Sequence, residues 1–266
     1  PRLFVCIVLI FNISCKDIGS KIEKTVSKNG MVFINGGKFE MGGDNDEARQ
    51  DEYPKHIVSI SSFWMDESEV TNAEFKKFVD ETGYITTAER QINWDEIKKM
   101  LPPNTPKPHD SLLSPASLVF KETSNSNLND YSRWWSLIRN ANWRQPFGPE
   151  SDLLGKDNYP VVHISWDDAN EYCKWSGKRL PTEAEFEYAS RAGMINNIYS
   201  WGNQKVNKGK LKANIWEGQF PKKNNVNDKF YYAAPVKSFS PNNYGIYDIA
   251  GNVWEWCSDW YHANYY

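Results

Sequence analysis

Near the end of the 266-residue chain, two carboxylates flank a turn that contains a glycine. Asp248 and Glu255 lie on either side of Gly251 and Asn252. Calcium takes roughly six to eight oxygen ligands from carboxylates and backbone carbonyls, and a turn between two acids can supply both kinds. The same spacing also suits an aromatic-rich hairpin whose two acids are solvated. The residues alone therefore indicate either a hard-cation site or a solvated turn.

Tryptophans alternate with polar residues in this same stretch, at Trp254, Trp256 and Trp260. Alternation of this kind predicts a strand-like segment with one face buried. The chain contains 12 Trp, and 15% of its residues are aromatic. We therefore expect a core built largely from rings.

Composition narrows the class of protein. The net charge is −3, so no global basic field exists to attract nucleic acid, and we expect no nucleic-acid partner. The cysteines are too few for a disulfide scaffold and lack the close pairs of a zinc site. They are Cys6, Cys15, Cys173 and Cys257. The length favours one large domain with an N-terminal appendage.

The appendage has the features of an export signal. Arg2 precedes an apolar run over residues 3–11, which is shorter than the roughly 20 residues that span a bilayer but suits a signal peptide. Ser14-Cys15 is similar to a bacterial lipoprotein processing site. We expect a signal peptide over 1–15, lipidation at Cys15 or ordinary cleavage, and a linker over 16–30. The protein would then be exported to the cell envelope and touch the membrane only through its lipid anchor.

The folded domain is expected over residues 31–266. Residues 31–43 predict a short hairpin around two glycines, followed by strands at 56–60 and 63–66 and a buried strand at 160–166. Three helices should begin where Ser or Thr stands three residues before an acid. These pairs are Thr71 with Glu74, Ser165 with Asp168, and Thr182 with Glu185. Prolines between 84 and 131 exclude a long helix there and favour a long loop.

Several motifs in this order resemble one known family. They are W-W at 134–135, A-N-W-R at 141–144, R-L-P-T-E-A-E at 179–185 and G-N-V-W-E-W at 251–256. The chain resembles the formylglycine-generating enzyme (sulfatase-modifying factor) family from Met31 to Tyr261. The resemblance implies an α+β fold related to C-type lectins, with little regular secondary structure.

The resemblance also implies particular site residues. Two calcium sites would fall on Asn214, Ile215, Asp228 and Phe230, and on Asp248, Gly251, Val253 and Glu255. At the second site, Asp248 replaces the Asn that is commoner in the family and adds a charge. Trp143 and Arg144 correspond to a block that lines the groove for the substrate peptide.

The implied activity is oxidation of a cysteine in a C-x-P-x-R segment of an unfolded sulfatase to formylglycine, with oxygen and copper(I). Copper(I) is soft and suits two thiolates, which the family supplies from a C-x4-C pair. No such pair occurs in the sequence, so no catalytic residue is assigned. We expect the domain to be C-terminally incomplete, the pair to follow Tyr266, and this chain alone to be inactive. The alternative is a non-catalytic envelope lipoprotein that uses the same fold for binding or structure.

Overall fold

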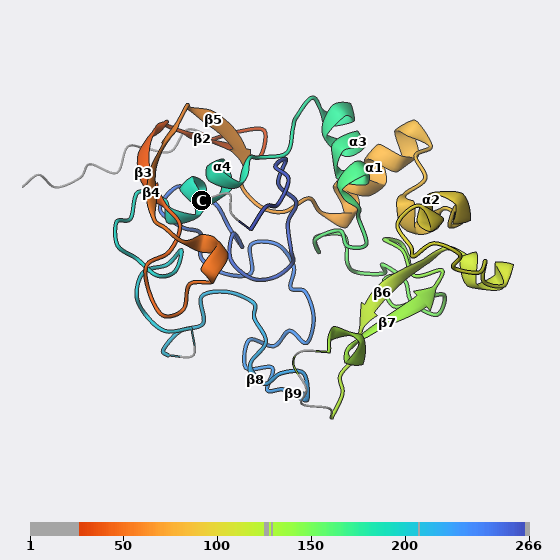
Figure 1. Cartoon of the computed structure of the whole chain (residues 1–266). Coiled ribbons are helices and arrows are strands. Elements are labelled where there is room, and N and C mark those ends of the chain that lie inside the picture. The colour runs from red at the N-terminus through yellow and green to blue at the C-terminus, as the bar shows by residue number, and fades with distance from the viewer. Residues whose placement is uncertain (1–26, 125–127, 129, 207, 264–266) are drawn as a thin grey trace, which may run out of the picture.

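The computed structural model describes residues 27–124, 128, 130–206 and 208–263. The expected signal peptide and Cys15 lie outside these residues. Short helices and strands alternate with long irregular segments (Figure 1). In the part of the chain that is described, no helix has the length and apolar character needed to cross a membrane.

The regular elements are short. The strands are β1 (Ser27–Lys28), β2 (Met31–Ile34), β3 (Gly37–Met41), β4 (His56–Ile60), β5 (Phe63–Asp66), β6 (Ala116–Phe120), β7 (Trp135–Arg139), β8 (Gly218–Gln219) and β9 (Lys223–Asn224). The α-helices are α1 (Asn72–Thr82), α2 (Trp94–Lys98), α3 (Trp166–Ser176) and α4 (Glu183–Arg191). Single 3-10 turns occupy Gln50–Glu52, Thr87–Glu89, Asp110–Leu113 and Tyr131–Arg133.

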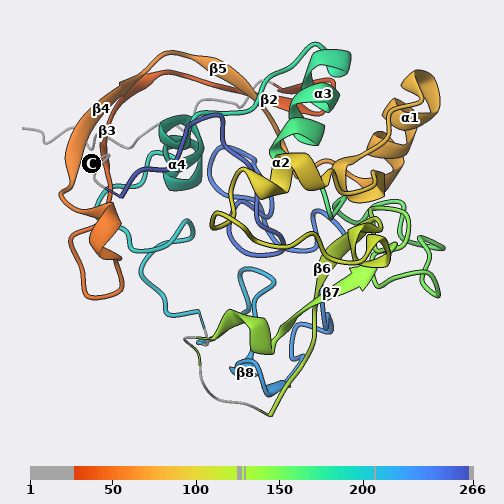
Figure 2. The ribbon, with the colours of Figure 1, turned by 45° about the vertical axis from the view of Figure 1, so that its right-hand side comes forward.

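The first strands form a long antiparallel ribbon rather than the hairpin predicted over 31–43. β2 pairs with β5 and β3 pairs with β4, and one register continues through both pairs, with Ile34 opposite Phe63 and Gly37 opposite Ile60. A Cβ on Gly36 would lie 2.4 Å from the Ile60 carbonyl oxygen. Gly36 therefore allows a close approach between strands, Gly37 allows the approach of the Tyr188 hydroxyl, and neither forms a turn. The ribbon arches over α4 (Figure 2).

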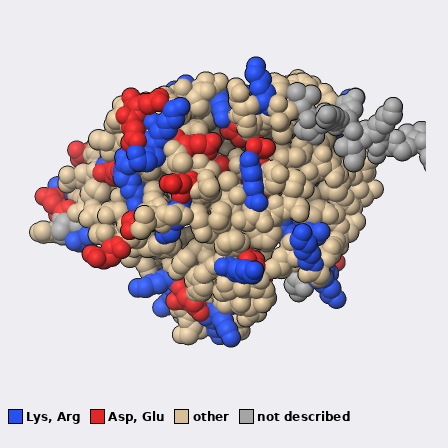
Figure 3. Space-filling model, turned by 180° about the vertical axis from the view of Figure 1, so that it is seen from behind, with Lys and Arg blue, Asp and Glu red and all other residues tan. Residues whose placement is uncertain are grey.

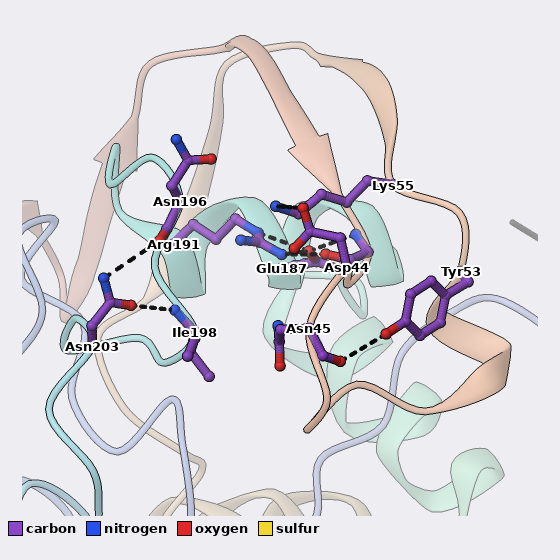
Figure 4. A network of polar contacts seen from close by, with 10 residues as sticks. Asp44, Asn45, Tyr53, Lys55, Glu187, Arg191, Asn196, Ile198 and Asn203 are labelled. Atoms are coloured by element: carbon purple, nitrogen blue, oxygen red, sulfur yellow. Dashed lines mark hydrogen bonds and ion pairs between the residues drawn. The ribbon is translucent and has the colours of Figure 1, made fainter.

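The loop that joins β3 to β4 is fastened to α4 (Figure 4). Gly42 donates its N–H to Glu187 Oε1 at 3.0 Å and accepts from Arg191 Nη2 at 2.7 Å. Within the loop, Lys55 pairs with Asp44 at 3.0 Å. These bonds hold the turn of the ribbon against the C-terminal half of α4.

Two aromatic-rich cores lie beneath these elements. The first joins β2 and α4 to the segment that carries Asp248, through Val32, Ile34, Tyr188, Ala189, Ile246 and Ile249. The second lies between α1 and α3 and consists of Phe75, Phe78, Val79, Trp143 and Tyr172. The expectation of a ring-built core is confirmed most clearly in this second cluster, where the Phe75 and Trp143 ring centroids are 5.2 Å apart.

The three predicted helix starts are confirmed. Thr71, Ser165 and Thr182 each accept a hydrogen bond from the backbone N–H of the acid three residues later. In each case that acid reaches back to the capping residue, so two unpaired helix-end donors are satisfied together. Left-handed glycines end α1 at Gly83 and α3 at Gly177.

Two other sequence expectations are wrong. The segment 84–131 is not one loop, because it contains α2 and β6, and β6 pairs with β7. Pro115 stands just before β6, where a proline is compatible with a strand. Residues 160–166 form no strand, because His163 adopts a left-handed φ of 60°, which interrupts an extended chain.

The tryptophan-rich stretch near the C-terminal end also differs from its prediction. Residues 253–257 form no regular element. Trp254 is 91% exposed and Trp260 is 89% exposed, so the alternation does not mark a strand with one buried face.

On the face seen in Figure 3, Lys and Arg are interspersed with Asp and Glu.

Candidate functional site

A cavity of about 1580 Å³ opens on the surface between the second core, β6 and the C-terminal stretch. Its wall is rich in rings, including Trp64, Phe120, Phe147, Trp216 and Trp254. Both predicted calcium constellations contribute to the same wall: Asn214, Ile215 and Phe230 from one, and Val253 and Glu255 from the other. The fold therefore brings residues of both predicted cation sites to the ring-lined wall, whereas Trp143 and Arg144 do not line this cavity.

The second predicted cation site is built on a turn with three left-handed residues, the third being Asn252 with a φ of 59°. Asp248 is 8% exposed and has a φ of 51°, and Gly251 has a φ of 87°. The Asp248 Oδ2 atom accepts the Lys237 N–H at 2.6 Å. A Cβ at position 251 would lie 2.4 Å from the Asn214 carbonyl oxygen. Gly251 is thus required where the two sites approach each other.

Asn252 joins the two sites, and sequence reasoning did not single it out. Its backbone N–H donates to the Asn214 carbonyl at 2.8 Å, and its Oδ1 accepts from Asn214 Nδ2 at 3.0 Å and from Ala234 N at 2.7 Å. Its Nδ2 donates to Glu69 Oε1 at 2.9 Å. The asparagine of the G-N-V-W-E-W motif therefore links three distant parts of the chain.

Glu69 is a third acid at this site that the sequence analysis did not identify. It is 8% exposed, and its Oε2 atom is buried without a hydrogen-bond partner among the described residues. Burial, together with the charge of Asp248, raises the pKa of Glu69 to about 7. The available signal was its place two residues before the Thr71 cap of α1, which gives no hint of a contact with the C-terminal turn.

Glu255 shows the same effect. Burial, with the nearby charges of Glu69 and Asp248, raises its pKa to about 8. The residue as a whole is exposed and lines the cavity. Burial also raises the pKa of Asp248. The charge of Asp248 thus raises the pKa of both Glu69 and Glu255, and a nearby cation would oppose this repulsion.

The first predicted cation site has a similar unsatisfied acid. Asp228 is 8% exposed; its Oδ1 accepts the Phe230 N–H at 2.9 Å, and its Oδ2 is buried without a partner among the described residues. Asn214 donates from Nδ2 to the Tyr232 carbonyl at 2.8 Å as well as to Asn252. These bonds determine which end of the Asn214 amide is the oxygen.

The donor set fits calcium rather than a transition metal. Among the described residues, no three His, Cys, Asp or Glu side chains converge closely enough to hold a metal by themselves. Calcium is different, because backbone carbonyls and water complete its shell of oxygens. The buried unpaired oxygens of Glu69 and Asp228 are hard ligands of the required kind.

The predicted substrate residues separate in the structure. Trp143 is 0% exposed in the second core, so its ring has no surface to offer a peptide. The Arg144 guanidinium stacks over that ring, 4.0 Å from its centroid, and lies 3.6 Å from Glu89 with its side chain 43% exposed. A substrate contact at this block is therefore expected from Arg144 alone.

The two described cysteines do not fit copper(I). Cys173 and Cys257 are free thiols. Burial is the main cause that raises both pKa values, that of Cys257 to about 12. Copper(I) prefers thiolates, whereas these groups remain protonated at neutral pH.

The His163 side chain bonds to two different segments at the cavity wall. Its Nε2 donates to the Pro146 carbonyl at 2.8 Å, and its Nδ1 accepts from Ser117 Oγ at 2.8 Å. The carbonyl can only accept, so Nε2 carries the hydrogen, and in the neutral ring Nδ1 is then the acceptor. Burial lowers the pKa of His163 below its ordinary 6.5. The imidazole joins β6 to the segment that follows A-N-W-R.

This lowered pKa predicts acid sensitivity. Below pH 6.5, His163 binds a proton more readily in the unfolded chain than in the folded chain. The free energy of unfolding is therefore highest above that pH, and below it decreases by at most about 1.4 kcal/mol per pH unit. Urea unfolding of the wild type and of His163→Gln on both sides of this pH measures the difference. Identical pH slopes for the two proteins would contradict the assignment.

A family model described as a sulfatase-modifying factor enzyme 1-like domain matches residues 18–266. The formylglycine-generating enzyme of Mus musculus is 45% identical over 232 residues, which is 87% of this chain and 58% of that protein. The enzyme of the same name from Streptomyces coelicolor is 42% identical over 242 residues, covering 90% of this chain and 72% of that protein. The chain therefore spans little more than half of the mouse enzyme.

Two further proteins are similar to this chain, one in sequence and one in structure. The inactive C-alpha-formylglycine-generating enzyme 2 of Bos taurus is 39% identical over 241 residues, covering 88% of this chain and 71% of that protein. The structure of PvdO from Pseudomonas aeruginosa aligns with a TM-score of 0.57 at 24% identity, covering 88% and 72% of the two chains. The latter bears on the fold alone. Since the family model covers nearly the whole chain, the chain belongs to the sulfatase-modifying factor family.

Proposed function

We propose that the full-length protein oxidises the active-site cysteine of a sulfatase to formylglycine. The observation that carries this proposal is the 45% identity to a formylglycine-generating enzyme across 87% of the chain. Fold alone would not support it, because one fold hosts many functions. The substrate is an unfolded sulfatase segment of the C-x-P-x-R type.

The cavity supports the proposal by its size and lining. Its volume of about 1580 Å³ exceeds the range of roughly 300–1,000 Å³ typical of small-molecule sites. Its rings can receive apolar side chains along an extended segment. An extended peptide matches a site of this size better than a compact metabolite does.

We also propose that two calcium ions bind beside this cavity. One would be held by Asn214, Ile215, Asp228 and Phe230, and the other by Asp248, Gly251, Val253 and Glu255. When bound, each ion supplies positive charge to buried carboxylates. The residues around the ions hold the turn at Gly251 and thereby fix the wall that carries Trp254. The role proposed for calcium is structural.

Copper(I) would supply the activation of oxygen when bound. Since Cys173 and Cys257 do not fit it, we assign no redox step to the described residues. The proposal places the copper ligands in a C-x4-C pair of the full-length protein, and this chain alone would be inactive. What the present residues contribute is the binding and orientation of the peptide.

The decisive experiment incubates full-length protein with a C-x-P-x-R peptide, oxygen and copper. Mass spectrometry should show the loss of mass that accompanies conversion of cysteine to formylglycine. A peptide with serine in place of the cysteine is the matched control and should remain unchanged. Absence of product, from a folded protein that carries the cysteine pair, would end the oxidase proposal.

The same assay addresses the alternative of a non-catalytic envelope protein. One relative with 39% identity to this chain is named as inactive. Similarity at this level therefore does not by itself distinguish an active enzyme from a non-catalytic protein. Binding of the peptide without conversion would support it.

We propose further that the protein is exported and anchored through Cys15. Metabolic labelling with palmitate should mark the wild type and fail to mark Cys15→Ala. A labelled Cys15→Ala variant, or an unlabelled wild type, would contradict the lipid anchor.

A further inference from the structure

Two acids in the segment 214–230, which we call the 214–230 loop, share an unusual arrangement. Glu217 Oε1 and Asp228 Oδ2 are both buried, and neither has a hydrogen-bond partner among the described residues. Each acid uses its other oxygen on a backbone N–H: Glu217 Oε2 accepts from Asn227 at 3.1 Å, and Asp228 Oδ1 accepts from Phe230 at 2.9 Å. Each carboxylate thus has one anchored oxygen and one unpaired oxygen.

The backbone places these two acids together. Asn227, which holds the Glu217 carboxylate, is the residue directly before Asp228. Glu217 is fixed at two further points, since its N–H donates to Asn224 Oδ1 at 3.2 Å and its carbonyl accepts from Asn225 N at 2.6 Å. The hairpin of β8 and β9 closes the loop between them (Figure 1). Neither carboxylate can turn away without breaking these bonds.

No charged partner on the protein accounts for the arrangement. Among the described residues, neither Glu217 nor Asp228 forms an ion pair with a Lys or Arg. An unpaired buried carboxylate oxygen is costly, and a second one on the same short segment adds repulsion between like charges. A divalent cation with a preference for oxygen would remove both costs at once.

We propose that Glu217 is a ligand of the cation bound by the 214–230 loop, so that this site carries two carboxylates, Glu217 and Asp228. The inference rests on the calcium proposal and extends it, since the family resemblance assigns only Asn214, Ile215, Asp228 and Phe230. A second carboxylate raises the charge that faces the ion, and charge count is one of the factors that set calcium affinity.

The test is a calcium titration of full-length wild type, Glu217→Gln and Glu122→Gln. Calorimetry counts the sites, and terbium used in place of calcium reports this site through light absorbed by Trp216, the neighbour of Glu217. Glutamine keeps the size of the side chain and an oxygen for the Asn227 N–H. Glu122, which accepts from the Tyr231 hydroxyl, is the control for loss of a nearby negative charge without loss of a ligand.

We expect Glu217→Gln to weaken one of two calcium sites by roughly tenfold or more, and Glu122→Gln to bind as the wild type does. In chelator, Glu217→Gln should melt no lower than the wild type, because the new amide can donate to Asp228 Oδ2. If Glu217→Gln does not fold, Glu217→Asp replaces it; the shorter acid should also weaken the site.

Three outcomes would overturn the inference. Equal calcium affinity for wild type and Glu217→Gln removes Glu217 as a ligand but leaves the calcium proposal standing. An equal loss in Glu122→Gln reassigns the effect to long-range charge. A wild type that binds no calcium removes this inference together with both calcium sites. None of the three affects the peptide conversion assay, which tests the oxidase proposal separately.

Discussion

Replacement of Trp143 by alanine should cost about 3–5 kcal/mol of unfolding free energy. The ring is 0% exposed, lies against Phe75 in the second core, and is covered on its outer side by the Arg144 guanidinium. Alanine would leave a cavity between α1 and α3 that neighbouring rings are too rigid to fill. Typical domains have only about 5–15 kcal/mol to lose, so much of the variant should be unfolded.

Urea unfolding measures this effect, and Arg144→Ala is the matched control. Arg144 is partly exposed, and it contributes one loose ion pair and a stacking contact with the Trp143 ring. Its loss should therefore cost about 1–2 kcal/mol, well below the effect of Trp143→Ala. If Trp143→Ala kept its unfolding midpoint and lost only peptide binding, the residue would belong to the substrate groove and the core assignment would fail.

The second large effect is expected at Asp168. This acid is 0% exposed, and its Oδ1 accepts from the Tyr84 hydroxyl at 2.9 Å and from the N–H and hydroxyl of Thr87 at 3.0 and 3.2 Å. Its Oδ2 accepts the Ser165 N–H at 2.8 Å. Asp168→Ala would leave these buried donors without an acceptor, and we expect a loss of about 3–5 kcal/mol.

Glu74→Ala is the comparison that isolates the contribution of the buried network. Glu74 occupies the same place in the capping box of α1, but its bonds to Thr71 lie at the surface. Its removal should cost about 1 kcal/mol. Equal urea midpoints for the two variants would show that Asp168 serves only as a helix cap.

Local chemistry made the helices predictable from the sequence. Each helix start depends on two residues three apart, and α1, α3 and α4 begin at the predicted places. Strand pairing was not predictable in this way, because the partner of β2 lies beyond a loop, and the two glycines at 36–37 are equally compatible with a turn or a close approach. The alternating tryptophans gave a wrong prediction of a strand for the same reason. Alternation of apolar and polar residues marks a strand only where another segment covers one face.

The site was predictable only in part. Asp228 and Asp248 are both buried, and bonds between Asn214 and Asn252 connect the segments that carry them, which the sequence did not predict. Glu69 could not be found by pattern, because its relation to Asp248 exists only in three dimensions. Trp143 and Arg144 are neighbours in the sequence, but Trp143 is fully buried and Arg144 is partly exposed. A motif identifies such a pair but not which member faces solvent.

The bond between Asn252 and Glu69 has a consequence for the order of folding. Its partners are 183 residues apart in the chain, so their meeting closes one of the longest loops in the domain. The entropic cost of such a closure grows only slowly with loop length, but contacts between distant residues slow folding. A nascent chain emerging from its N-terminus can complete the ribbon and α1 early, but the contact with Glu69 must wait until residue 252 has been made. Binding of the proposed calcium would then be a late event, so a chain interrupted before residue 252 would keep this region open to proteolysis.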